Sequence, residues 1–226
     1  MNESLFNRLF HYKETSNIKP EENYLTELLA WMIDTLPKFG HDYVRFLCSK
    51  CQPAISLDSF LQYEVNAQTQ VSVKKGFIDM VITADTIGFI CEHKIDSELS
   101  EGQLRKYKQC KNEIDKSLDY KIVLVTKKQI QHKQNPDIAI TWQDIYDYYA
   151  KKIEDNDYDI SEEIIIEQFL MYLTEAGMGK QESINIESVN RYSEAEKLEN
   201  TLKRLFDDLK NDPDWECTGI QKLVPA

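Results

Sequence analysis

The chain has 226 residues, of which 42% are hydrophobic and 11% aromatic, and its formal net charge is −12. This length suits one compact domain with a small appendage, and only seven glycines and six prolines argue against a low-complexity chain. No stretch approaches the roughly 20 apolar residues of a membrane span, and the N-terminal region has no continuous apolar segment. We therefore expect a cytoplasmic protein that does not contact membranes.

The cysteine pattern points to reduced thiols. An odd number of cysteines without a secretory signal is typical of a reducing compartment. Cys48 and Cys51 form a CxxC motif, but a structural zinc site takes four ligands, and only His41 lies nearby in sequence. We interpret the pair as packed thiols. The five cysteines are Cys48, Cys51, Cys91, Cys110 and Cys217.

Residues 20–36 predict an amphipathic helix with Pro20 in its first turn. At about 100° per residue, Glu22 falls on the edge of the apolar stripe, whereas Glu27 and Asp34 fall on the opposite face, which we expect to be solvated. Glu22 is therefore the acid of the three that can face inward. The apolar stripe comprises Leu25, Leu28, Leu29, Met32, Ile33 and Leu36.

Three strand-like runs follow at residues 69–73, 77–84 and 87–95, and the short turns between them predict a β-meander. A helix, two strands and two helices are then predicted, at residues 98–118, 120–126, 138–142, 143–153 and 161–176. Because a strand–helix–strand order implies a parallel crossover, we expect an α/β fold with a central mixed sheet flanked by helices. Trp142 is expected to anchor the core.

Residues 177–181, which include two glycines, predict a hinge near the end of the main domain. We place that domain at 1–178 and a C-terminal helical extension at 179–226. Within the extension, a charged helix is expected at 193–210. A strand predicted at 215–224 would either begin a further region or pair back onto the sheet.

Two of the predicted strands carry charges inside nearly continuous apolar runs: Asp79 in one, and Glu92 with Lys94 in the next. Alternation puts Glu92 and Lys94 on one face of their strand and His93 on the other, with the core. Burying an isolated charge costs several kcal/mol unless the charge is paired or binds a metal. Two carboxylates can hold Mg²⁺, and a lysine beside them can stabilise negative charge that develops on a phosphate.

The segment GFIDMVITADTIGFICEHK resembles the motif of the PD-(D/E)XK nuclease superfamily, in which an acid on one strand precedes acid–x–lysine on the next. Ile78 stands where the motif has proline. Gln103 to Tyr107 resembles the QxxxY helix of the RecB-like branch, and Glu22, with Thr26 one turn later, resembles the helical acid of the family. The resemblance covers roughly residues 20–150.

The resemblance implies a restriction-endonuclease-like fold. It also implies hydrolysis of DNA with Mg²⁺ or Mn²⁺, in bacterial or phage genome defence or repair. Catalytic roles are implied for Asp79, Glu92, Lys94 and, as an auxiliary residue, Gln103. Metal ligands are implied at Asp79, Glu92, the backbone carbonyl of His93 and, as an auxiliary, Glu22.

Basic residues flank these motifs where a phosphate backbone would have to lie. The nucleic-acid-binding candidates are Lys74, Lys75, Arg105, Lys106 and Tyr107, and a second basic stretch contains Lys127, Lys128, His132 and Lys133. The residues leave several alternatives open: an ordinary solvated face for the basic residues, a helix-dipole role for Glu22, RNA in place of DNA, or a non-catalytic binding domain on a nuclease scaffold. A homo-oligomer, or an effector domain within a larger defence assembly, is also compatible.

Overall fold

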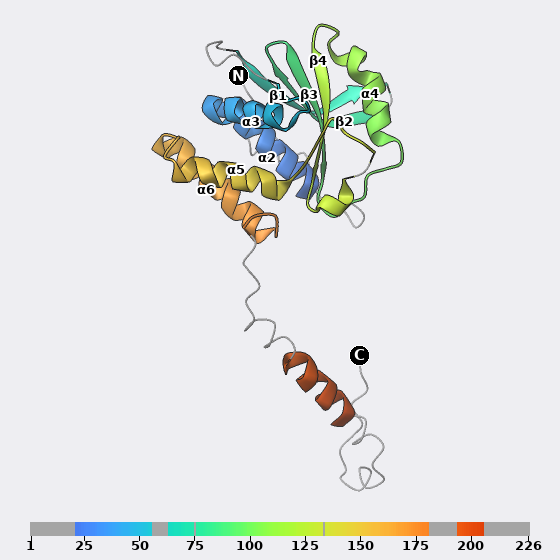
Figure 1. Ribbon diagram of the computed structural model, residues 1–226, viewed down its shortest axis with the longest axis vertical. Coiled ribbons are helices and arrows are strands. Elements are labelled where there is room, and N and C mark those ends of the chain that lie inside the picture. Colours follow the sequence, from blue (N-terminus) through green and yellow to red (C-terminus); the bar gives the residue numbers. More distant parts are fainter. Residues whose placement is uncertain (1–20, 56–62, 75, 133, 181–193, 206–226) are drawn as a thin grey trace. The chain divides into compact units, whose positions relative to one another are not determined.

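The computed structural model describes residues 21–55, 63–74, 76–132, 134–180 and 194–205 (Figure 1). The chain divides into two compact units, Met1–Gln181 and Glu182–Ala226. The first unit holds a five-stranded mixed sheet of strand order β1-β2-β3-β4-β5, flanked by helices. The expected α/β arrangement is confirmed at this level.

Strands β1 to β3 pair antiparallel, and β3, β4 and β5 pair parallel, so the expected meander and crossover are both confirmed. The strands are β1 Val65–Val73, β2 Gly76–Ala84, β3 Ile87–Lys94, β4 Asp119–Thr126 and β5 Ile138–Thr141. The helices are α2 Glu21–Thr35, α3 Pro37–Lys50, α4 Gln103–Ile114, α5 Trp142–Glu154 and α6 Ile160–Glu175, with a short 3₁₀ turn, η1, at Gln129–Gln131.

Helices cover both faces of the sheet. Figure 1 shows α4 on one side and the other helices of this unit on the other. The face toward α4 has its own apolar cluster, which includes Ile90 and Leu104, and the opposite face carries a larger core that includes Phe89 and Trp142. Because the sheet is covered on both faces, every residue of β3 is buried, as its apolar run predicts.

Local signals set where the helices begin. Thr141 caps α5 through a reciprocal capping box with Asp144, and Trp142 behind it is fully buried in the core, as expected. Helix α4 begins at Gln103, five residues later than predicted, because Gly102 adopts a left-handed conformation with φ of 71° directly before it. It also ends earlier, at Ile114.

The prediction of a solvated face for Glu27 and Asp34 is wrong. Glu27 is only 5% exposed, and its Oε1 accepts a hydrogen bond of 2.5 Å from the Thr69 hydroxyl. Asp34 accepts a hydrogen bond of 2.7 Å from the backbone N–H of Ala67. Because α2 packs against β1 as well as α3, its polar side is covered by the sheet. The periodicity of a single helix gives no information about such a second neighbour.

The remaining described residues bear on smaller predictions. All four described cysteines, including Cys48 and Cys51, are buried, and none of them forms a disulfide. A helix occupies residues 194–205 of the second unit, within the predicted 193–210. The strand expected at 215–224 lies outside the described residues. Within the described ranges, no helix is long and apolar enough to cross a membrane.

Candidate functional site

Strands β2 and β3 stop pairing where their charged residues stand. Their register ends with Met80 opposite Cys91, one residue before Asp79 would face Glu92. Instead, Oδ2 of Asp79 accepts the backbone N–H of His93 at 3.0 Å. On its other side, the pairing with β1 skips Asp79 and Gln70, and Gln70 has a left-handed φ of 49°, which is uncommon for a residue with a side chain. The carboxylate of Asp79 thus lies at a local opening of the sheet.

Glu92 is fully buried but has three partners. Its Oε1 lies 2.6 Å from the ammonium of Lys94 and accepts a hydrogen bond of 2.7 Å from Nε2 of Gln103. Its Oε2 accepts the hydroxyl proton of Tyr107. Because a buried carboxylate needs both a counter-charge and hydrogen-bond donors, this set explains why the sheet tolerates Glu92. The predicted motif residues Glu92, Lys94, Gln103 and Tyr107 are therefore in direct contact.

Glu22 reaches the same cluster from the first turn of α2. Its Oε1 accepts a hydrogen bond of 2.9 Å from Lys94, while Oε2 accepts from the backbone N–H of Ile95 at 3.1 Å and the Ser97 hydroxyl at 2.7 Å. Lys94, 8% exposed, therefore bridges carboxylates on α2 and β3. Glu27 lies elsewhere, against β1. The contribution of Ser97 was not predicted, since a serine in a loop carries no distinctive sequence signal.

Thr26 and His93 connect α2 to β3. The Thr26 hydroxyl donates to the backbone carbonyl of Glu22 at 2.8 Å, so it must accept the Nδ1 proton of His93, also at 2.8 Å. His93 is fully buried, as expected, and its ring packs on Trp142 with centroids 5.1 Å apart. Burial and the charge of Lys94 lower the pKa of His93 to about 3, which keeps the ring neutral. The backbone N–H of His93 thus holds Asp79, and its ring is joined through Thr26 to the first turn of α2.

The cluster has more negative than positive groups. Glu22 and Glu92 contact the single ammonium of Lys94, and Asp79 interacts with it electrostatically. Burial, together with the charge of Glu92, raises the pKa of Asp79 to about 8. Burial by itself would lower the pKa of Lys94, but the charges of Glu92 and Asp79 raise it above its usual range. Lys94 is therefore cationic, and the surplus of carboxylates favours a further cation.

The donor set fits a hard divalent cation, because carboxylate and carbonyl oxygens are the ligands that Mg²⁺ and Mn²⁺ prefer. Across the described ranges, no group of three or more His, Cys, Asp or Glu side chains stands ready to hold a metal ion. The Lys94 ammonium contacts both Glu92 and Glu22. The resemblance implies Asp79, Glu92 and the carbonyl of His93 as ligands, and a cation there would have to compete with Lys94 for Glu92.

None of the family models, curated proteins or solved structures compared with this chain matches it.

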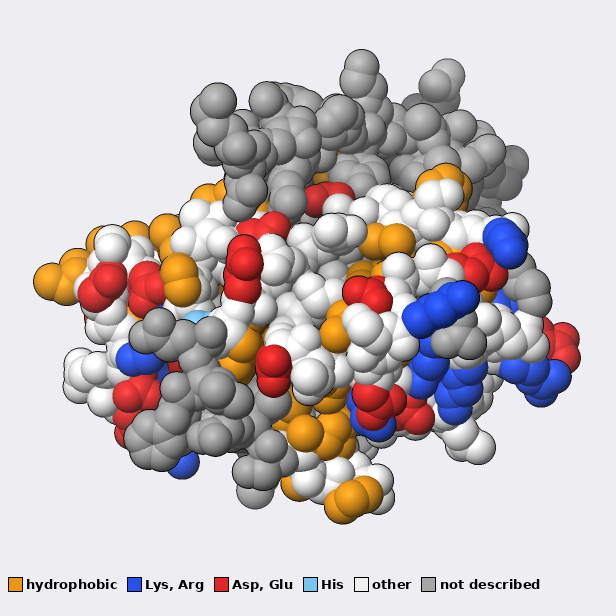
Figure 2. Space-filling view, turned by 90° about the horizontal axis from the view of Figure 1, so that it is seen from above, with side chains coloured by type: hydrophobic (Ala, Val, Ile, Leu, Met, Phe, Trp, Pro, Cys, Tyr) orange, Lys and Arg blue, Asp and Glu red, His pale blue; other side chains and the backbone are white. Residues whose placement is uncertain are grey.

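Basic side chains gather on α4, which follows the acid–x–lysine strand. Arg105, Lys106 and Lys108 are exposed, and Figure 2 shows lysine and arginine side chains collected on the side of the molecule where α4 lies. Lys74 is also exposed, whereas Lys75 is outside the described residues. Tyr107 differs from the other candidates: it is 5% exposed and its hydroxyl contacts Glu92. It therefore supports that carboxylate and offers no surface to nucleic acid, contrary to the prediction.

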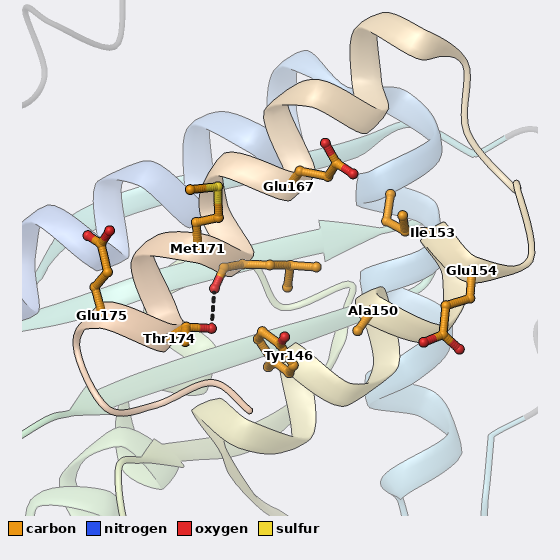
Figure 3. Close-up of a pocket in the computed structure, with 9 residues that line it drawn as sticks. Tyr146, Ala150, Ile153, Glu154, Glu167, Met171, Thr174 and Glu175 are labelled. Carbon is orange, nitrogen blue, oxygen red and sulfur yellow. Dashed lines mark hydrogen bonds between the residues drawn. The ribbon is translucent and has the colours of Figure 1, made fainter. Parts of the chain in front are cut away.

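A separate hollow of about 540 Å³ lies between α5 and α6 (Figure 3). Apolar side chains such as Ile153 and Met171 line it, together with the acidic side chains of Glu154, Glu167 and Glu175. None of the predicted site residues borders it. Its acidic lining disfavours phosphate groups, so we do not associate it with nucleic acid.

Proposed function

We propose that this chain is a metal-dependent nuclease of the PD-(D/E)XK type, with a restriction-endonuclease-like fold, that hydrolyses phosphodiester bonds of DNA with Mg²⁺ or Mn²⁺. Genome defence or repair in a bacterium or phage is the proposed setting. One observation carries the proposal: carboxylates from three separate elements gather where the pairing of β2 with β3 ends. Glu92 and Glu22 contact Lys94, and Asp79 accepts the backbone N–H of the neighbouring His93. A purely structural ion pair would not need the third carboxylate.

In this proposal Asp79, Glu92 and the His93 carbonyl hold the cation. When bound, it supplies positive charge that polarises the phosphodiester and makes water a stronger acid. Lys94 places its ammonium near the phosphate oxygens, where negative charge develops in the transition state. The hydrogen bonds to Glu92 from the Gln103 amide and the Tyr107 hydroxyl fix the orientation of that carboxylate.

The direct test is incubation of plasmid, linear duplex, single-stranded DNA and RNA with the protein, in Mn²⁺, in Mg²⁺ and in EDTA. We expect divalent-dependent cleavage of DNA, and the same preparation carrying Asp79→Asn controls for contaminating nuclease. Cleavage confined to RNA would change the substrate and leave the site assignment standing. Failure to cut any of the four, with no metal binding by calorimetry, would overturn the proposal.

Metal affinity should depend on pH through Asp79. Because its pKa is raised to about 8, the metal-free site holds a proton at neutral pH that a cation must displace. Affinity for Mn²⁺ is therefore expected to rise with pH until about pH 8 and then to level off. The stability of the metal-free protein should change with pH in the opposite direction. The proton on Asp79 stabilises the folded state, and this contribution is lost as pH rises toward 8.

Calorimetric titration in two buffers of different ionisation enthalpy measures the proton release directly. At neutral pH, wild-type protein is expected to release protons on binding Mn²⁺, and Glu27→Gln, at an acid that contacts Thr69 of β1, should release the same number. An affinity that stays constant from pH 6 to pH 8 would contradict the raised pKa of Asp79.

Glu22, and not Glu27, should be the acid of α2 that matters for cleavage. Glu22→Gln weakens the hold on Lys94, so we expect turnover to fall about 10- to 100-fold, the range for residues that orient a metal site. Glu27→Gln keeps an acceptor for the Thr69 hydroxyl and should cut at the wild-type rate. Single-turnover cleavage of one DNA substrate by both variants makes the comparison. The reverse order of effects would contradict the placement of Glu22.

A further inference from the structure

One aromatic side chain stands exposed beside the candidate site. Phe77 is 63% exposed, and it is the only exposed aromatic residue in the part of the chain that the structure describes. Phe77 precedes Asp79 by two residues in β2, so their Cα atoms are at most about 7 Å apart. An exposed phenylalanine forgoes the stabilisation that burial of its ring would bring. Its location at the site suggests that the exposed ring binds a ligand.

The backbone of Phe77 is fixed to the site. The carbonyl of Phe77 lies 3.2 Å from the Tyr107 hydroxyl, the same hydroxyl that contacts Glu92. Just before it in the β1–β2 hairpin, the backbone N–H of Lys74 donates to Glu113 of α4 at 3.0 Å. The ring therefore projects from a held position at the edge of the carboxylate cluster, with the exposed side chain of Lys74 close by in the chain.

A second exposed apolar side chain is linked to the cluster from another element through its chain neighbour. Ile130, in η1, is 81% exposed. Its neighbour Gln131 donates to the backbone carbonyls of Ile95 and Ser97, at 3.2 and 3.3 Å, and the Ser97 hydroxyl in turn donates to Glu22. Phe77 is thus connected to Glu92 through Tyr107, whereas Ile130 is connected to Glu22 through two residues, Gln131 and Ser97. One exposed apolar residue is therefore linked to Glu92 and another to Glu22.

Resting on the proposed nuclease function, we propose that Phe77 stacks on an unpaired base next to the phosphate that is cleaved. The preferred substrate is then single-stranded DNA or an unpaired end of a duplex. In an intact duplex the base faces are stacked on one another and are closed to a side chain, whereas every base of a single strand has a free face. Stacking is tolerant of sequence, because every base has a π-face.

The charge of the chain favours the same conclusion. Phosphate contacts by lysine and arginine provide most of the affinity of non-specific nucleic-acid binding, and that affinity falls steeply with salt. This chain has a net charge of −12, so its ionic attraction for a polyanion is weak apart from local clusters such as α4. Contacts between bases and apolar side chains add affinity that does not depend on net charge.

The test measures binding in an Asp79→Asn background, so that the DNA stays intact. A labelled oligo(dT) single strand and a blunt duplex of equal length are titrated by fluorescence anisotropy in Mg²⁺. Adding Phe77→Ala is expected to weaken single-strand binding about 5- to 150-fold and to change duplex binding little. Phe77→Trp should retain the affinity. Ile164→Ala, at an apolar residue on α6 that is 55% exposed, is the control and should have no effect.

Cleavage assays distinguish a failure of the stacking proposal from a failure of the proposed nuclease function. With Asp79 restored, wild type should show a higher kcat/KM on single strands than on duplex, and Phe77→Ala should reduce that ratio. Equal kcat/KM on both substrates, unchanged by Phe77→Ala, would overturn the stacking proposal and leave the nuclease intact. Stacking measured in the binding assay without cleavage by wild type would instead overturn the nuclease.

Discussion

Asp79→Asn is expected to lower Mn²⁺-dependent cleavage by more than about 100-fold, the upper range for residues that only orient a metal site, and to leave the fold intact. Asparagine keeps an oxygen that can accept the His93 N–H, but it removes the charge that a divalent cation requires. Since burial disfavours the ionised form of Asp79, removing that charge should not destabilise the metal-free protein.

Two measurements test this prediction. Initial cleavage rates at saturating Mn²⁺ give the loss of activity, and thermal unfolding in EDTA gives the stability, which should equal or exceed that of wild type. The isosteric Glu27→Gln serves as a control at an unrelated buried acid. Asp79→Asn cutting at the wild-type rate would remove Asp79 from the site.

Lys94→Ala is expected to reduce kcat about 10²- to 10³-fold with little change in DNA affinity. Lys94 contacts Glu92 and Glu22, so it has an alternative role as their counter-ion. In that role its removal would leave buried negative charge uncompensated, at a cost of about 3–5 kcal/mol of stability. In the catalytic role the cation neutralises Glu92, and Lys94 acts on charge that appears only in the transition state.

The two roles of Lys94 separate when melting temperature and kcat are both measured in saturating Mn²⁺. Lys106→Ala, at an exposed position on α4, is the control with the opposite expected effect. It should weaken DNA binding and reduce the salt dependence of that binding, and leave the cleavage rate at saturating DNA nearly unchanged. A Lys94→Ala variant that melts several degrees lower but cuts normally would leave Lys94 a structural counter-ion only.

The strands and their charged residues could be predicted because two independent rules agreed. Continuous apolar runs indicated a sheet covered on both faces, and alternation placed Glu92 with Lys94 and His93 with the core. Both placements are observed. The resemblance added the expectation that Gln103 and Glu22 lie near these strands, and both contact the cluster.

The features that could not be predicted from the sequence depend on contacts between elements that are distant in the chain. Glu27 is buried because β1 packs beside α2. Asp79 leaves the strand pairing because Gln70 has a left-handed backbone conformation and the N–H of His93 binds the Asp79 carboxylate. Thr26 was visible one turn after Glu22, but its acceptance of the His93 proton required the tertiary structure. Local periodicity describes one element at a time, whereas these contacts are between elements.

The carboxylates of the cluster are satisfied by protein groups alone. Lys94 serves two of them, and backbone and side-chain donors complete the set. We therefore expect the protein to fold without an ion, in contrast to small zinc domains, in which the free energy of metal binding is the free energy of folding. Under the proposed function, the cation is then an exchangeable reactant. Catalytic output would follow the free concentration of Mg²⁺ or Mn²⁺ around a scaffold that is already assembled, and chelation would switch the protein off reversibly.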